Sequence, residues 1–92
     1  MIQIKSQDQV VFLNGAGAPG MPGEGRALMA TFEVVNSSSV NQEFRNGAGI
    51  TWVSVLPGQA TVISVPVDKA NRVVCHTDGP TPSGTVNCLG AS

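Results

Sequence analysis

The sequence predicts a small all-β domain, either an antiparallel β-sandwich or a small β-barrel, and three observations support this. The apolar stretches are short and rich in β-branched residues, which fit a pleated strand better than a helix. Glycine and proline separate these stretches at close spacing, as is typical of turns between short strands. The chain has 92 residues, which suits one domain, so residues 1–92 are expected to fold as a single unit.

Strands are expected wherever this pattern recurs. Residues 50–56 and 60–67 flank Pro57-Gly58, a turn sequence, and are predicted to form a β-hairpin. Pro66 cannot donate a hydrogen bond to a neighbouring strand, so it indicates a sheet edge or a bulge. The remaining strands are expected at residues 9–13, 27–35, 42–45, 71–77 and 85–89, and the large apolar side chains expected to anchor the core are Phe12, Phe32, Trp52, Val62 and Val65.

Residues 27–35 fit two descriptions. As a strand, the segment would place Leu28, Ala30, Phe32 and Val34 on one face. As a helix, it would use the good helix formers at its start. Because the segment is short and ends in two valines, the strand is preferred.

Residues 14–25 are rich in glycine and proline and are predicted to form a long loop or an extended arm. Gly15, Gly17 and Gly20 match the spacing of a dinucleotide-binding turn, but Pro22 and Gly23 stand where that turn needs a helix. Glycine at every third position instead favours an extended, polyproline-like backbone. The arm would dock on a neighbouring subunit through Gly17, Pro19, Gly20, Met21, Pro22 and Gly23. The alternative is a surface loop between two strands.

Two cysteines, Cys75 and Cys88, lie on expected strands joined by a Gly/Pro loop. This spacing predicts a disulfide between neighbouring strands, and the alternative is a pair of buried free thiols. A zinc site with His76 is disfavoured because adjacent residues of a strand point to opposite faces. No metal or other cofactor is therefore expected.

The sequence also predicts no enzyme. His76 is the only histidine and has Asp78 near it, but the chain has no Gly-x-Ser-x-Gly motif. Its glutamates are isolated from one another, so no pair suggests acid–base catalysis. Asn36-Ser37-Ser38 matches the N-glycosylation pattern, which matters only for a secreted protein.

Composition narrows the choice of partner. Charged residues make up 12% of the chain, against about 25% in an ordinary soluble domain, and five basic residues face six acidic ones. No basic excess is available for nucleic acid or for an anionic membrane. The first residues do not match a signal peptide, and no apolar run reaches the ~18 residues of a membrane span. The chain is therefore expected to be either a product of the host cytoplasm, as a virion protein would be, or the mature form of an extracellular protein.

These features favour a non-enzymatic structural protein whose partners are other protein subunits. Small size, low charge and an arm beside a β core suit a virion decoration or cement protein, such as those on bacteriophage heads, bound as a homo-oligomer, for example a trimer. The alternative is an extracellular, adhesin-like or carbohydrate-binding β-sandwich, for which Trp52 would stack on a sugar.

Overall fold

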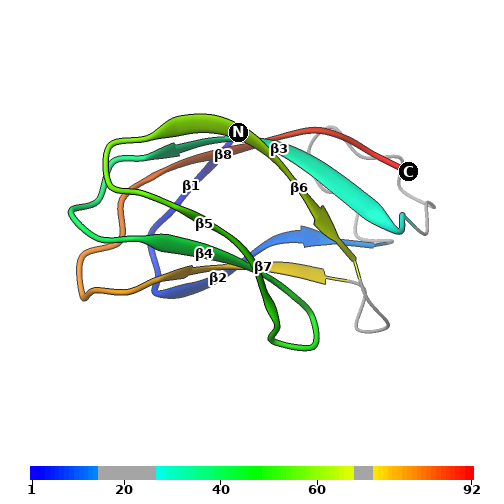
Figure 1. Ribbon diagram of the computed structural model, residues 1–92, viewed down its shortest axis with the longest axis horizontal. Coiled ribbons are helices and arrows are strands. Elements are labelled where there is room, and N and C mark those ends of the chain that lie inside the picture. The colour runs from blue at the N-terminus through cyan, green and yellow to red at the C-terminus, as the bar shows by residue number, and fades with distance from the viewer. Residues whose placement is uncertain (15–26, 68–71) are drawn as a thin grey trace.

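The computed structural model describes residues 1–14, 27–67 and 72–92, and the regular structure in these ranges consists of strands. Two antiparallel sheets of four strands pack face to face, which confirms the all-β class and selects the sandwich over the barrel (Figure 1). The strands are β1 (Ile2–Gln3), β2 (Asp8–Leu13), β3 (Met29–Asn36), β4 (Gln42–Asn46), β5 (Thr51–Val55), β6 (Ala60–Pro66), β7 (Arg72–Thr77) and β8 (Gly84–Ala91).

The strand order follows one rule. β1 pairs with β8, β2 with β7, β3 with β6 and β4 with β5, as in a long hairpin that runs outward from the β4–β5 turn. Further pairing of β3 with β8 and of β4 with β7 gives a first sheet, β1-β8-β3-β6, and a second sheet, β2-β7-β4-β5. Eight strands wound in this order over two sheets form a jelly roll.

The hairpin expected from residues 50–56 and 60–67 is wrong. β5 is an edge strand of the second sheet and β6 is an edge strand of the first, so the turn between them crosses from one layer to the other. The turn itself forms as expected, because Gly58 has a φ of 74° and the Gln59 amide donates to the Leu56 carbonyl at 3.1 Å. The Gly58 amide donates to the Asn36 carbonyl at 2.8 Å, which ties this crossover to the end of β3.

The core lies between the sheets and centres on three aromatic rings. Phe32 of the first sheet meets Phe12 edge-on at 6.4 Å between ring centroids and stacks on Phe44 at 6.3 Å. All three rings are fully buried, and Val65 joins them, so the expectation holds for Phe12, Phe32 and Val65. Residues 29–36 form a strand, with Ala30, Phe32 and Val34 buried, so the strand prediction for this segment is confirmed and the helix is excluded. Leu28 precedes the strand and is exposed.

Two of the expected core anchors, Trp52 and Val62, are wrong. Trp52 occupies a bulge: Phe44 pairs with Val53 and Arg45 with Thr51, so Trp52 has no partner on β4 and its side chain is 56% exposed. Val62 precedes buried Ile63 on β6, and strand alternation turns its side chain to the opposite face, where it is 57% exposed.

Asn36 joins the two sheets from a fully buried position. Its Nδ2 donates to the Val40 carbonyl at 2.8 Å and to the Val55 carbonyl, on β5, at 2.9 Å. Its Oδ1 accepts from the Ser38 amide at 3.0 Å and from the Ser38 hydroxyl at 2.5 Å. Because both amide protons are donated inside the protein, the Asn36-Ser37-Ser38 triplet presents no free side-chain amide to a glycosyltransferase in the folded state.

The Gly/Pro-rich segment falls almost wholly outside the described residues. The proposed arm residues Gly17, Pro19, Gly20, Met21, Pro22 and Gly23 all belong to the range 15–26. The residues on either side of that range are bonded to each other: Asn14 Nδ2 donates to the Ala27 carbonyl at 3.1 Å, and the Ala27 amide donates to Asn14 Oδ1 at 3.0 Å. Asn14 and Ala27, the described residues on the two sides of this range, are therefore held together.

Candidate docking surface

The outer faces of the two sheets differ in charge. On the second sheet, strand alternation turns outward Asp8 of β2, Glu43 and Arg45 of β4, and Arg72 and His76 of β7. His76 bonds to Asp8 on the neighbouring strand, and Glu43 bonds to Arg45 on its own strand and to Thr51 on β5. This face therefore carries several charged and polar groups, with Val10 exposed among them. A surface of this kind is well solvated and is costly to dehydrate.

His76 is held between two carboxylates on this charged face. Its Nδ1 lies 2.6 Å from Asp8 Oδ1, and its Nε2 lies 3.2 Å from Asp78 Oδ1. Both ring nitrogens therefore face an acid, and this geometry leaves neither of them directed at a serine. Among the described residues, no cluster of three or more His, Cys, Asp or Glu side chains has the geometry of a metal site.

Glu43 is the second centre of this face. Its Oε1 accepts from the Thr51 hydroxyl at 2.7 Å and from Arg45 at 2.9 Å. The Thr51 hydrogen bond, and after it the Arg45 hydrogen bond, lower the pKa of the Glu43 carboxyl because they stabilise its charged form. The charged form of Glu43 is thus favoured on this side of the sandwich.

The outer face of the first sheet, here called the neutral face, has one charged residue, Glu33, among its strand positions. Its exposed apolar side chains are Met29, Val35, Val62 and Leu89, with exposed fractions from 37% to 57%. The uncharged polar side chains between them are Thr31, Ser64, Thr85 and Asn87, and the Thr31 and Ser64 hydroxyls are 2.9 Å apart. A face of this composition loses little hydration energy when another protein covers it.

Leu89 reaches the neutral face through a bulge. Cys88 pairs with Phe32 and Gly90 with Thr31, so Leu89 has no partner on β3 and is 53% exposed. The sequence reasoning missed Met29, Val35 and Leu89 as surface residues. The alternation of residues 28–35 contained the signal for the first two, because placing Ala30, Phe32 and Val34 in the core sends their neighbours outward.

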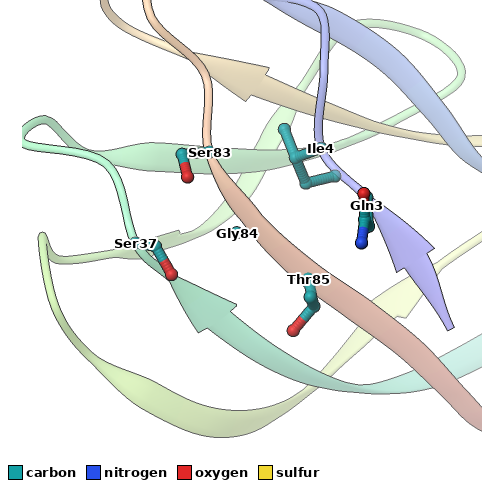
Figure 2. Close-up of a pocket in the computed structure, with 6 residues that line it drawn as sticks. All are labelled: Gln3, Ile4, Ser37, Ser83, Gly84 and Thr85. Atoms are coloured by element: carbon teal, nitrogen blue, oxygen red, sulfur yellow. The ribbon is translucent and has the colours of Figure 1, made fainter.

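A shallow pocket of about 300 Å³ opens at one end of the first sheet, and Figure 2 shows the residues around it. Its lining comes from β1 and the following residue, from the loop after β3 and from the start of β8: Gln3, Ile4, Ser37, Ser83, Gly84 and Thr85. None of these lining side chains, all from described residues, is ionisable. Such a lining can form hydrogen bonds with a neutral polar group, but it offers no base to activate its serines.

Gly84 shapes this pocket by allowing two strands to approach. Its φ is 137°, and a Cβ at this position would collide with the Val35 carbonyl oxygen and lie 3.1 Å from the Ser37 amide nitrogen. The Ile4 amide donates to the Gly84 carbonyl at 2.9 Å, so the same residue also holds the end of β1. Any side chain at position 84 would therefore push β8 away from β3.

The disulfide expected between Cys75 and Cys88 is wrong, because no disulfide joins these two cysteines. Cys75 pairs with Phe44 in the second sheet, whereas Cys88 pairs with Phe32 in the first sheet. The two cysteines therefore lie in different sheets, next to the stacked pair of Phe32 and Phe44. Burial, with a smaller contribution from Asp8, raises the pKa of the Cys75 thiol to about 12, and burial also raises the pKa of Cys88. The protonated form of both thiols is thus favoured over the thiolate.

Comparison of the chain with protein-family models, with curated proteins and with solved structures finds no match. None of the described segments forms a helix with the length and apolar character needed to cross a membrane. The function is therefore inferred from the surface of the molecule itself. The structure places Trp52 and Val62 on the consecutive edge strands β5 and β6, keeps Cys75 apart from Cys88, and leaves the arm residues outside the described ranges.

Proposed function

We propose that this protein is a non-enzymatic assembly protein, a small decoration, cement or minor structural protein of a virion such as a bacteriophage capsid, bound as symmetric copies. The observation that carries the proposal is the neutral face, where exposed Val62 and Leu89 lie on a sheet surface with one charge, Glu33. The opposite face carries Asp8, Glu43, Arg45, Arg72 and His76 and would remain in solvent. A two-sided sandwich of this kind suits a protein that is covered on one side and solvated on the other.

Two further features support the same role. The jelly roll occurs in capsid proteins, although it also occurs in lectins and cupins, so the fold agrees with the proposal without selecting it. The pocket lined by Ser37 and Ser83 offers hydroxyl groups that can form hydrogen bonds with a neutral polar group of a partner.

The first test is the composition of the particle. Particles of the virus that encodes the chain are purified on a density gradient, and mass spectrometry is used to look for this protein in stoichiometric amounts. Capsid and portal genes beside its coding sequence are the expected genomic context. Absence of the protein from the particle fraction would overturn the virion role.

The second test locates the docking surface. Leu89→Lys adds a charge to the neutral face at an exposed bulge, and Val10→Lys adds the same charge to an exposed position, 49% accessible, on the second sheet. Pull-down with particles that lack the protein should show weakened binding for Leu89→Lys and unchanged binding for Val10→Lys. Equal binding of both variants would exclude the neutral face as the contact.

A second candidate function is an extracellular carbohydrate-binding or adhesin-like module. The exposure of Trp52 favours it, because an indole on the surface can stack on a sugar ring, and lectins share the fold. The three phenylalanines are buried and the chain has no tyrosine, so Trp52 would have to act as a platform alone. Titration of Trp52 fluorescence with a panel of oligosaccharides tests this role: a saturable change supports it, and no change for any sugar contradicts it.

A further inference from the structure

The four sheet edges of the sandwich differ in how they are protected from pairing with another chain. β1 has two residues, β2 begins with Asp8 and has a bulge at Val11, and β5 has the Trp52 bulge. β6 pairs with β3 in unbroken register over all seven of its residues and contains no charged side chain. Charges, bulges and shortness are the means by which natural proteins protect edges, so among the described strands β6 is the open one, with Pro66 only at its end.

The hydrogen bonds between β3 and β6 define which groups of β6 face outward. The Asn36 amide donates to the Gln59 carbonyl at 3.0 Å, and the Val67 amide donates to the Leu28 carbonyl at 2.8 Å. Because bonded pairs alternate along an antiparallel ladder, Thr61, Ile63 and Val65 use their backbone groups on β3. The backbone groups of Ala60, Val62, Ser64 and Pro66 therefore point away from the sheet, and all of these except Pro66 have an N–H to donate.

We infer that β6 binds β6 of a second copy of this chain, antiparallel about a two-fold axis at Val62. In this register Val62 lies opposite Val62 of the second copy, and Ala60 lies opposite Ser64 of the second copy. Each pair exchanges two backbone bonds, about six in total. Pro66, which has no N–H, falls at each end of this ladder, where it interrupts nothing. The two first sheets thereby become one continuous sheet.

Charge supports a second copy as the occupant. A two-fold axis brings like groups together, so a charged edge would repel itself, whereas the outward side chains of β6 are neutral. Among the described strand residues of this face, the nearest charge is Glu33, which pairs with Val62 and lies one strand inside the edge. Two Glu33 side chains would be separated by three strand spacings, about 14 Å. This exceeds the screening length of ~8 Å at physiological salt. The dimer adds to the proposed assembly role and does not depend on it.

The experiment is a measurement of molar mass by sedimentation over a concentration series up to about 1 mM. The purified full chain should reach the mass of two copies. Val62→Lys should remain monomeric, because it places two ammonium groups side by side at the axis. Val35→Lys, which puts the same charge on the same face one strand away, should still dimerise. Circular dichroism of both variants checks that the fold is retained, which is expected because both side chains are exposed.

A charge-swap pair makes the test independent of any loss of stability. Val62→Lys and Val62→Glu should each be monomeric alone and should form a 1:1 dimer when mixed. In the wild-type protein, the amides of Val62 and Ser64 should show hydrogen-exchange protection that rises with protein concentration. A wild-type chain that stays monomeric, a dimer that survives Val62→Lys, or loss of the dimer in Val35→Lys would each overturn the inference.

These outcomes are separate from those that test the virion role. A dimer in solution together with a chain absent from particles would refute the role and leave the β6 contact standing. A monomeric chain that still binds particles would refute the β6 contact and leave the role standing.

Discussion

Replacing Asn36 with alanine removes the amide that joins β3 to β5 and holds the loop between β3 and β4. Four hydrogen bonds are lost, to the Val40 and Val55 carbonyls and from the Ser38 amide and hydroxyl. A buried hydrogen bond contributes about 1 kcal/mol net, and a buried group left unpaired costs about 1–3 kcal/mol. The Ser38 hydroxyl has one proton and, once Asn36 is removed, it can donate this proton to the Val40 carbonyl, which lies 2.9 Å away. This bond, or water, offsets part of the loss. We expect Asn36→Ala to reduce the free energy of unfolding by about 4 kcal/mol.

Urea unfolding followed by circular dichroism measures this loss, with the m-value compared between variants to check two-state behaviour. A loss of this size is a large share of the 5–15 kcal/mol typical of a folded domain, and it corresponds to a fall in Tm on the order of 20 °C. Ser39→Ala, an exposed change in the same loop, is the matched control and should alter stability by less than about 0.5 kcal/mol.

Asn36→Asp separates the donor role from the acceptor role. Aspartate keeps an oxygen for Ser38 but turns a second oxygen toward the Val40 and Val55 carbonyls, so its loss should equal or exceed that of the alanine variant. A loss below about 1 kcal/mol for Asn36→Ala would refute the reasoning, since it would mean that the network adds nothing beyond what water provides.

Three further predictions concern backbone strain, thiol chemistry and the tryptophan. Gly84→Ala should destabilise the fold by at least about 2 kcal/mol in thermal unfolding, whereas Gly90→Ala, with nothing within 4 Å of its Cβ, should not. A thiol-reactive reagent at pH 8 should label Cys88 slowly and Cys75 only after the protein is unfolded. The unfolded protein should then show two reactive thiols, and a count of zero would mean that the two cysteines form a disulfide. Trp52 should be quenched readily by acrylamide in the native state, and Trp52→Ala should cost less than about 1 kcal/mol; a shielded indole or a loss of about 3 kcal/mol would place it in the core.

The strands could be read from the sequence because their signal is local. Stretches such as Ala60–Pro66 are β-branched and end in turn residues, and the structure forms strands there. The strand β1 was not predicted, because its two residues are too few to show an alternating pattern. The Pro57-Gly58 turn was located correctly but its consequence was not, since the same turn chemistry serves a hairpin within one sheet and a crossover between two.

Errors at single residues came from register, which depends on contacts between strands. Trp52 and Leu89 are displaced by bulges at Phe44/Arg45 and Thr31/Phe32, and neither bulge has a mark in the local sequence. Cys75 and Cys88 lie on strands that follow each other along the chain, but the jelly-roll order sends these strands to opposite layers. The composition shows that the chain has few charged residues. That several of them, Asp8, Glu43, Arg45 and Arg72, share one face could be seen only from the structure.

The bond between Asn14 and Ala27 has a consequence for engineering. Two hydrogen bonds hold these residues to each other, so the two ends of any peptide placed between them are fixed close together. The entropy of closing a loop grows only with the logarithm of its length, by about 0.6 kcal/mol for each doubling. Foreign peptides inserted between Asn14 and Ala27 should therefore be carried by a sandwich of nearly unchanged stability, which makes this point a natural position for an epitope or an affinity tag.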